Sequence, residues 1–381
     1  MNFWLMLLLS VLLGAGQVAS ANPANSGSTV AANPADKSPS GAAAASPLTS
    51  IPMGKGLPVI VRAGLFFQTV SSFNENDGKF KGRVDLRLRW QDLRLRYPAD
   101  ETPRGYKEFV AEQADKMLTQ IWSPGAMLDN LIGQPTYQVS NLRIYPDGWV
   151  EFMQRTDGSF EVPVNANNFP FDKQALGVEV VVRQKTTKEA ALVVLQQDLD
   201  FSKAASSIEL DGWKIGPVTV IRTLHNGWYD SHHSGIRAVL TVHRQVSKVI
   251  GQIFIPLLAS LLIPLIAVWM NSTEDGGFNV SAFEVVNIVV GGLFAVIALN
   301  FSINSEYKFI STGDNLVTRL FALNYVTLAM SMLIVVLLFR LNLPMRWFGI
   351  RVQHVIFDVI YWAFPTMVAA IAGSLILAAG I

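Results

Sequence analysis

The sequence predicts two structural parts: an all-β extracytoplasmic sandwich (immunoglobulin-like, antiparallel) and an all-α four-helix transmembrane domain. From Ile51 to Gln245, apolar and polar residues mostly alternate between turn signals, which indicates half-buried strands. Beyond this region, four apolar stretches approach or exceed the roughly 20 residues that cross a bilayer. We therefore expect a signal peptide (1–21), a disordered leader (22–50), the sandwich (51–245) and the helical domain (246–381).

The first 50 residues resemble an export signal followed by a leader. The apolar core Trp4–Leu13 is too short to span a membrane, and Ala19-Ser20-Ala21 fits a small-residue cleavage site, so we expect cleavage after Ala21. Residues 22–50 are rich in Ala, Ser, Pro, Asn and Gly and contain no large apolar cluster. Such a segment cannot bury enough surface to offset its ordering entropy, which favours disorder.

Composition excludes several classes of protein. The 381 residues carry a net charge of only +1, which gives no indication of nucleic-acid binding, and they include no cysteine, so no disulfide framework is possible. The sequence contains no H-E-x-x-H motif and no phosphate-binding glycine loop. We expect no enzymatic activity, no cofactor and no bound metal.

The strands can be placed individually. Apolar residues occupy every second position from Val84 to Trp90, and the alternation resumes in the other phase at Leu93, which predicts a β-bulge near Gln91-Asp92. Pro-Asp-Gly and Thr-Asp-Gly turn signals bracket a strand at Trp149–Arg155. Further strands are predicted at Gln174–Arg183, Ala191–Gln196, Trp213–Arg222 and Gly235–His243, and a short helix at about Thr102–Met117.

The predicted spans are Val249–Met270, Phe283–Ile303, Leu320–Leu341 and Val355–Ile381. If the export signal is cleaved, both ends of the mature chain lie outside. The loop between the last two spans is then cytoplasmic, and it contains Arg340, Arg346 and Arg351 without an acidic residue. This distribution agrees with the positive-inside rule.

Four motifs follow one another along the chain: W-x-D-x-R-L at Trp90–Leu95, W-x-P at Trp122–Pro124, P-D-G-x-V at Pro146–Val150 and F-P-F-D-x-Q at Phe169–Gln174. With these motifs in this order, the chain resembles the pentameric ligand-gated ion channels (the Cys-loop receptor superfamily), especially their bacterial branch. The resemblance covers about Leu57 to Ile381. The two half-cystines of that family fall at Val162 and Leu176, so packing would close the loop here.

The resemblance implies a homopentamer in the bacterial inner membrane, with the sandwich in the periplasm and membrane lipid around the helices. Its transported ions would be monovalent cations, and it would respond to a small-molecule ligand or to protons. The sequence leaves open a non-conducting sensor with the same architecture. A membrane-anchored enzyme is a third possibility that no motif supports.

The second span carries the candidate pore residues. With about 100° per residue, Ile288, Gly291, Ala295, Ala298 and Ser302 fall within about 40° of Glu284, an ionisable residue inside an apolar helix. A ring of Glu284 side chains would attract cations, and Ile288 would constrict the pore. The family usually places a bulky apolar ring where this chain has Gly291, and Ser305 or its neighbours replace an expected proline. Small residues at this spacing are equally typical of helix packing.

The resemblance also implies a coupling site. In the family, the F-P-F-D loop rests on the loop after the pore helix, and its acid pairs with a base before the first span. Carried over, Asp172 pairs with Arg244, and Glu75 or Asp77 joins them; a surface pair of little consequence is the alternative. The other coupling candidates are Trp90, Asp92, Phe169, Pro170 and Phe171.

An agonist site between neighbouring sandwiches would use Trp122, Phe152, Arg183, Trp228 and Tyr229. Its cationic character favours an anionic or zwitterionic ligand, whereas loop packing is the alternative role for the two loop aromatics. The histidines near this loop are His225, His232, His233 and His243. Adjacent histidines on a strand point to opposite faces and chelate poorly, so proton sensing is the more plausible role of the two.

Overall fold

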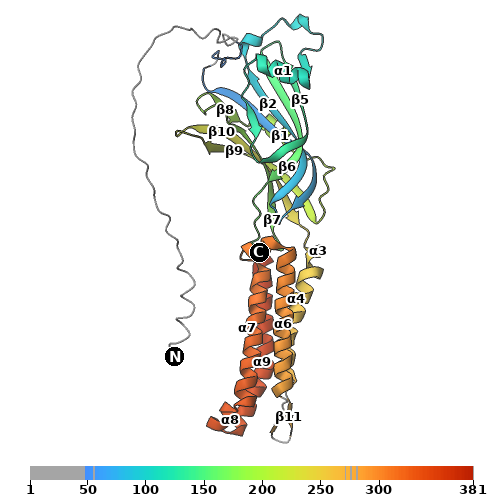
Figure 1. Ribbon diagram of the computed structural model, residues 1–381, viewed down its shortest axis with the longest axis vertical. Helices are drawn as coiled ribbons and strands as arrows, with labels where there is room; N and C mark the ends of the chain where they lie inside the picture. The colour runs from blue at the N-terminus through green and yellow to red at the C-terminus, as the bar shows by residue number, and fades with distance from the viewer. Residues whose placement is uncertain (1–47, 55, 271, 275–276, 280–281, 381) are drawn as a thin grey trace, which may run out of the picture. The chain divides into compact units, whose positions relative to one another are not determined.

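The computed structural model describes residues 48–380 except 55, 271, 275–276 and 280–281, so the expected signal peptide and most of the leader lie outside the described residues. Two β-sheets form a sandwich, and four long apolar helices follow it in the chain (Figure 1). The predicted fold class is confirmed. One sheet pairing departs from the antiparallel expectation: Val59–Arg62 run parallel to Ala190–Val193.

The larger sheet has the strand order β3-β5-β6-β2-β1-β8, and the smaller sheet has the order β4-β7-β10-β9. The strands of the larger sheet are β1 (Val59–Asn74), β2 (Lys79–Gln91), β3 (Lys107–Val110), β5 (Leu131–Ile144), β6 (Trp149–Glu161) and β8 (Ala190–Val193). Those of the smaller sheet are β4 (Ala126–Leu128), β7 (Lys173–Val182), β9 (Trp213–Asn226) and β10 (His232–Arg244).

The short helices of the sandwich are α1 (Glu112–Gln120), α2 (Gln196–Phe201), η1 (Leu93–Leu95) and η2 (Ala99–Glu101). The helix expected at Thr102–Met117 therefore begins later than predicted. Residues 107–110 instead pair with β5 as strand β3. Edge pairing provides these backbone groups with hydrogen-bond partners that a helix would otherwise have supplied.

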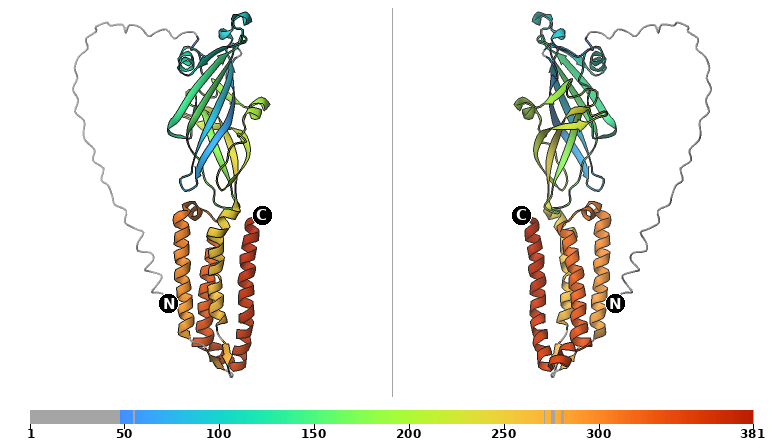
Figure 2. Two further views of the ribbon diagram at one scale, coloured as in Figure 1. Left: turned by 90° about the vertical axis from the view of Figure 1, so that its right-hand side faces the viewer. Right: turned by 90° about the vertical axis from the view of Figure 1, so that its left-hand side faces the viewer.

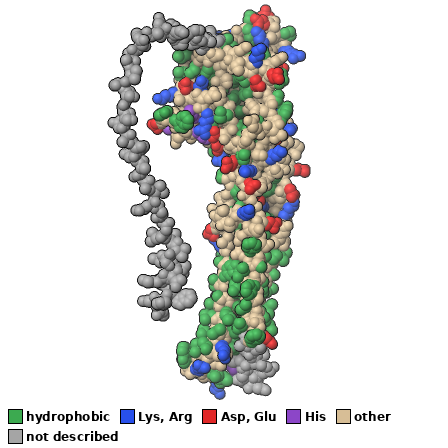
Figure 3. Space-filling view, in the orientation of Figure 1, with side chains coloured by type: hydrophobic (Ala, Val, Ile, Leu, Met, Phe, Trp, Pro, Cys, Tyr) green, Lys and Arg blue, Asp and Glu red, His purple; other side chains and the backbone are tan. Residues whose placement is uncertain are grey.

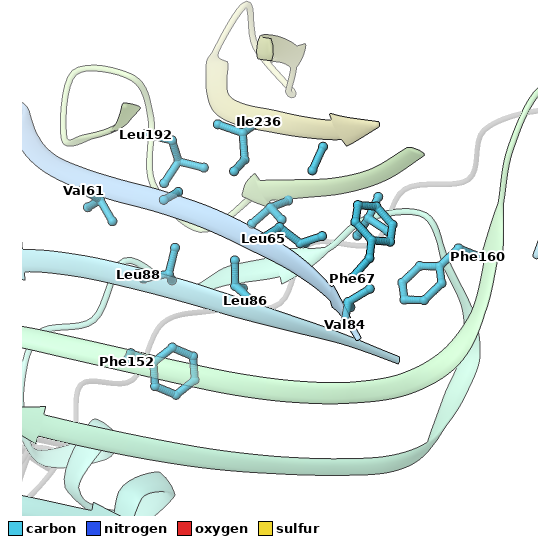
Figure 4. Close-up of a cluster of buried hydrophobic side chains, with 14 of the residues drawn as sticks. Val61, Leu65, Phe67, Val84, Leu86, Leu88, Phe152, Phe160, Leu192 and Ile236 are labelled. Carbon is cyan, nitrogen blue, oxygen red and sulfur yellow. The ribbon is translucent and has the colours of Figure 1, made fainter. Parts of the chain in front are cut away.

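The sandwich core is built from the alternating residues that predicted the strands (Figure 4). Leu65 and Phe67 of β1, Leu86 of β2 and Ile236 of β10 are all buried in it. Each such side chain stabilises the fold by about 1.5–3 kcal/mol on burial. The half-cystine positions Val162 and Leu176 are buried in the same core, so apolar packing occupies the place of the disulfide.

The phase change after Trp90 is not a β-bulge, so that prediction was wrong. Strand β2 ends at Gln91, and the buried Asp92 side chain accepts a hydrogen bond from the backbone N–H of Arg94 at 3.1 Å, which caps η1. The Arg94 guanidinium donates hydrogen bonds to both Asp92 carboxylate oxygens, at 2.9 and 2.7 Å. The motif thus ends a strand with a buried carboxylate that is paired and hydrogen-bonded, as a buried charge requires.

Four segments are long and apolar enough to cross a membrane: Val246–Trp269, Phe283–Glu306, Leu316–Arg340 and Ile350–Ala379. Figure 2 shows these helices lying side by side. The helical elements are α3 (Val246–Val249), η3 (Ile250–Phe254), α4 (Ile255–Ser260), α5 (Leu262–Trp269), α6 (Ala282–Glu306), η4 (Lys308–Thr312), α7 (Leu316–Val335), η5 (Val336–Arg340), α8 (Leu343–Phe348) and α9 (Ile350–Gly380). A two-stranded hairpin, β11 (Ser272–Glu274) with β12 (Gly277–Asn279), lies between α5 and α6.

Candidate functional site

A buried cluster of three charged residues joins loops of the sandwich to the start of the first span. Arg244, the last residue of β10, donates to Asp172 from Nε at 2.6 Å and from Nη2 at 3.0 Å. Its Nη1 donates to Glu75, in the turn between β1 and β2, at 3.2 Å. The side chains of Arg244, Asp172 and Glu75 are only 5%, 1% and 16% exposed. Asp77, the other candidate for this cluster, instead accepts a hydrogen bond from Asn74.

Three aromatic rings surround the Arg244 guanidinium. Its central carbon lies 4.8, 4.3 and 5.5 Å from the ring centroids of Phe169, Trp213 and Phe309. Phe309 belongs to η4, directly after α6, and packs edge-on against Phe169 at 5.6 Å. One buried cation therefore contacts the sandwich and the segment that follows α6. A displacement of η4 would change the surroundings of this charge.

Burial and hydrogen bonding act in opposite directions on the pKa values of Glu75 and Arg244. Burial raises the pKa of Glu75 above its ordinary value of 4.5, although the hydrogen bond from Arg244 opposes the shift. Burial also works against the charge on Arg244, but the hydrogen bonds to Asp172 and Glu75 leave the pKa of Arg244 raised. The arginine therefore stays charged while Glu75 is protonated more readily than a solvated glutamate.

A second link joins the turn between β1 and β2 to the segment after α6. Asn76 donates from Nδ2 to the backbone carbonyl of Glu306 at 2.8 Å and accepts from the backbone N–H of Phe309 at 3.4 Å. One amide side chain thus bridges the end of α6 and the start of η4. The turn contacts this segment both through Asn76 and, by way of Arg244, through Glu75.

The packing of α6 defines its orientation within the chain. Its buried side faces α4, α5 and α7 and comprises Val285, Val289, Gly292, Val296 and Ile303. A Cβ on Gly292 would lie 2.6 Å from Ile263 Cγ2, so glycine permits the close approach of α5. Of the predicted pore stripe, Glu284, Gly291, Ala295, Ala298 and Ser302 are exposed, whereas Ile288 is half-buried and packs against this core.

The side of α6 opposite the buried one carries three phenylalanines. At about 100° per residue, Phe283, Phe294 and Phe301 fall within about 20° of one another and about 180° from the centre of the buried side. They are 76%, 68% and 78% exposed. Asn287 and Ala298 lie on the same side. The three phenylalanines lie about 80–100° around the helix from Glu284, the centre of the predicted stripe.

A pocket of about 750 Å³ lies at the loop between β9 and β10. Arg183, Trp228 and Tyr229, all predicted ligand residues, line it together with Asn226, Gly227, Ser231 and His233. Tyr229 is fully exposed. Trp122 and Phe152, the other two predicted ligand residues, lie in the sandwich core and do not reach this pocket.

Among the described residues, Asp129, Glu179 and His225 form a set whose ligand atoms lie within 4.8 Å of one another, as a metal ion would require. Arg183, however, donates to both Asp129 oxygens at 2.8 Å. That hydrogen bonding lowers the pKa of Asp129, although burial opposes it. The Arg183 guanidinium therefore already neutralises part of the negative charge of this set. His225 Nε2 lies 3.0 Å from Thr223 Oγ1, and His233 Nδ1 lies 2.9 Å from the backbone carbonyl of Lys185.

Comparison with known proteins identifies the family. Residues 49–246 match the family model described as the neurotransmitter-gated ion-channel ligand binding domain, which covers more than half of the chain. The chain belongs to the pentameric ligand-gated ion-channel family. It is also similar to the proton-gated ion channel of Gloeobacter violaceus, with 26% identity over 250 residues, 65% of this chain. The aligned part spans 64% of the length of that relative.

Membership in this family fits the other observations. The four spans make the chain a multi-pass protein of the bacterial inner membrane, with the ligand-binding-type domain on its outer side. The family consists of channels and is not an enzyme class. Within the F-P-F-D motif, Phe169 and Asp172 contact Arg244, Pro170 is buried, and Phe171 is exposed.

Some expected coupling residues lie elsewhere, and others were missed. Trp90 and Asp92 are near the opposite end of β2 from the turn that carries Glu75, separated by about 40 Å of extended chain. Trp90 packs there against Trp122, with ring centroids 6.2 Å apart. Sequence reasoning missed Asn76 and Phe309. The available signals were weak: an amide beside the expected acid, and an aromatic in the loop predicted to meet the F-P-F-D segment.

Proposed function

We propose that this chain is the subunit of a homopentameric cation channel that opens when a ligand or protons act on the periplasmic sandwich. The single observation that carries this proposal is the Arg244 cluster. It places one buried cation against sandwich loops and against η4, the segment directly after α6. The description of the Gloeobacter relative as proton-gated supports protons as one stimulus.

The exposed flanks of α6 support assembly into a ring. One flank carries the small residues Gly291, Ala295 and Ser302, and the flank about 180° away carries Val286, Leu293 and Ile297. In a head-to-tail ring, the small flank of one copy faces the bulky flank of the next, which is the complementarity that a closed heterologous ring needs. The side with the three phenylalanines then faces the ring axis.

We propose accordingly that Phe294, near the middle of α6, forms the apolar constriction in place of Ile288. A ring of bulky apolar side chains closes a pore by dewetting. Asn287, Ala298 and Phe301 would line the pore on either side of it. Glu284, in the first turn of α6, would lie at the edge of the pore mouth and attract cations.

Cysteine accessibility tests this arrangement. The natural chain has no cysteine, so no cysteine-free background has to be prepared first. A charged, water-soluble thiol reagent is applied to Phe294→Cys and to Ile288→Cys channels in liposomes while current is recorded. We expect modification of Phe294→Cys to reduce the current and Ile288→Cys to be protected. The opposite pattern would restore the stripe centred on Glu284 and Ile288. If the two variants and the natural chain all carry no current at any pH tested, the result would favour a non-conducting sensor.

Selectivity is tested separately at Glu284. Glu284→Gln removes the proposed ring of carboxylates without changing side-chain size. We expect the reversal potential in a salt gradient to move toward zero as cation preference falls. An unchanged reversal potential would remove Glu284 from the ion pathway.

A further inference from the structure

Three side chains that can ligate a metal ion meet on the smaller sheet, on the face that points away from the sandwich core. Glu179 lies on β7 between the core residues Val178 and Val180, so its side chain points outward. His225 belongs to β9, and Asp129 lies in the turn between β4 and β5. One ligand atom from each of the three lies within 4.8 Å of the other two. Figure 3 shows histidine side chains close to acidic and basic ones in the part of the sandwich that Figure 1 labels β9 and β10.

Hydrogen bonds hold the turn that carries Asp129 beside Glu179. The backbone N–H of Asp129 donates to the backbone carbonyl of Glu179 at 2.8 Å. The next residue, Asn130, accepts from the Glu179 N–H through Oδ1 at 2.9 Å and donates from Nδ2 to the Gly177 carbonyl at 2.8 Å. Two of the three ligands are therefore held next to each other before any ion binds, which lowers the entropic cost of binding.

The third ligand reaches this pair across β10, the strand between β7 and β9. A missing side chain on β10 makes room for it. A Cβ on Gly235 would lie 2.9 Å from Cδ2 and 3.0 Å from Nε2 of His225, so the imidazole occupies the space over this glycine. Thr223 Oγ1 lies 3.0 Å from the same Nε2, and this contact holds the ring in place. The half-buried imidazole thus lies within reach of Asp129 and Glu179.

The arginines beside the three ligands leave room for an ion. Arg183 donates to both Asp129 oxygens at 2.8 Å, and Arg237 Nε lies 3.5 Å from Glu179 Oε1. A carboxylate offers about four lone-pair positions, so a bidentate arginine does not occupy all of them. Carboxylates that ligate metals are themselves hydrogen-bonded by outer partners in this way. The Asp129 and Glu179 side chains are 22% and 25% exposed, so an ion can enter from solvent.

We propose that Asp129, Glu179 and His225 bind a divalent transition-metal ion such as Zn²⁺. One imidazole nitrogen and two carboxylate oxygens suit Zn²⁺, whereas Ca²⁺ and Mg²⁺ prefer oxygen ligands alone. Three protein ligands leave the fourth position of a tetrahedral ion to water. We expected no bound metal from the sequence, in which these three residues form no motif. The proposal does not depend on whether the chain conducts ions.

Calorimetric titration of the purified full-length protein with Zn²⁺ tests the proposal. The protein carries no histidine tag, because a tag would itself bind the ion. We expect saturable binding of a single ion per chain, and we expect this binding to persist in a large excess of Ca²⁺ because Ca²⁺ does not favour an imidazole ligand. An absence of saturable binding would overturn the proposal, as would displacement of Zn²⁺ by the excess Ca²⁺.

Two variants assign the binding to the proposed ligands. His225→Gln and Glu179→Gln each replace one ligand with an uncharged amide. Loss of an outer partner alone weakens metal binding about 10–100-fold, so each variant should bind Zn²⁺ at least roughly tenfold more weakly. The matched control, His232→Gln, removes an exposed histidine of β10 that is not one of the three ligands and should leave the affinity unchanged. An unchanged affinity in His225→Gln, or an equal loss in the control, would contradict the assignment and overturn the proposal.

X-ray absorption spectroscopy of the natural chain provides a second measurement if the variants do not fold. The protein is loaded with no more Zn²⁺ than one ion per chain. We expect one imidazole in the ligand shell, with the remaining ligands oxygen atoms at about 2.0–2.2 Å. A shell without imidazole, or one with two or more imidazoles, would place the ion elsewhere and overturn the proposal.

Discussion

Replacing Arg244 with glutamine should destabilise the chain far more than replacing an exposed arginine. Arg244→Gln leaves Asp172 and Glu75 buried at 1% and 16% exposure without their cation. It also removes the cation from the rings of Phe169 and Trp213. The free-energy cost of desolvating the two carboxylates is then no longer offset by attraction to the arginine.

Breaking a buried ion pair by removing one partner costs about 3–5 kcal/mol. For a domain of the size of the sandwich, this corresponds to a melting temperature lower by roughly 6–20 °C. The loss should be greatest near neutral pH and smaller in acid, because protonation neutralises the stranded carboxylates. The matched control is Arg183→Gln, whose pair with Asp129 is 37% and 22% exposed. An exposed pair of this kind contributes about 0–1 kcal/mol.

The assay is thermal unfolding of the reconstituted protein at neutral pH, followed by tryptophan fluorescence, since the Trp213 ring lies 4.3 Å from the guanidinium carbon. A double-mutant cycle with Asp172→Asn then isolates the interaction free energy between Arg244 and Asp172. We expect the double variant to lose much less than the sum of the two single losses. Strictly additive losses, or an Arg244→Gln effect no larger than that of Arg183→Gln, would refute the reasoning.

Three further outcomes are expected. Because burial raises the pKa of Glu75 above 4.5, its contribution to stability is present below that pH and is lost as the pH rises through the raised value. The melting temperature of the natural chain should therefore fall relative to that of Glu75→Gln as the pH rises above 4.5, and a difference that stays constant with pH would contradict this. Asn76→Ala, which breaks the hydrogen bonds to Glu306 and Phe309, should shift activation to a stronger stimulus in current recordings while leaving assembly unchanged on size-exclusion chromatography. Tyr229→Ala should raise the ligand concentration for half-activation with little change in melting temperature, because Tyr229 is fully exposed; unaltered activation would exclude it from the ligand site.

The separation of interacting residues along the chain determined how much of the site could be predicted. Asp92 and Arg94 lie two positions apart, and their pairing follows from local turn geometry once the end of the strand is recognised. Asp172 and Arg244 lie 72 positions apart, and only the family resemblance connected them. Glu75 and Arg244 lie 169 positions apart, so the choice between Glu75 and Asp77 required the structure.

The sandwich was predictable for a physical reason that does not apply to α6. A strand with one face in the core and one in water shows its orientation as alternation, so β1 and β2 could be placed from pattern alone. In a membrane helix the face toward lipid and the face toward protein are both apolar, and polarity no longer marks the buried side. The rotation of α6 is instead determined by shape. Gly292 lets α5 approach, and the exposed phenylalanines Phe283, Phe294 and Phe301 lie on the opposite side.

Glu284 is the one polar residue of the second predicted span before Asn287, and the predicted pore stripe was centred on it. In the proposed ring, the same flank of α6 instead faces a helix of the neighbouring copy. Two adjacent glycines separate these possibilities. Gly292→Ala would bring a Cβ within 2.6 Å of Ile263, so it should push α5 and α6 apart and destabilise the protein, whereas Gly291→Ala meets no atom of the described chain within 4 Å. If Gly291→Ala alone disrupts the pentamer on size-exclusion chromatography, its flank forms the contact between neighbouring copies; if it leaves the pentamer intact and changes only the current, that flank faces the pore.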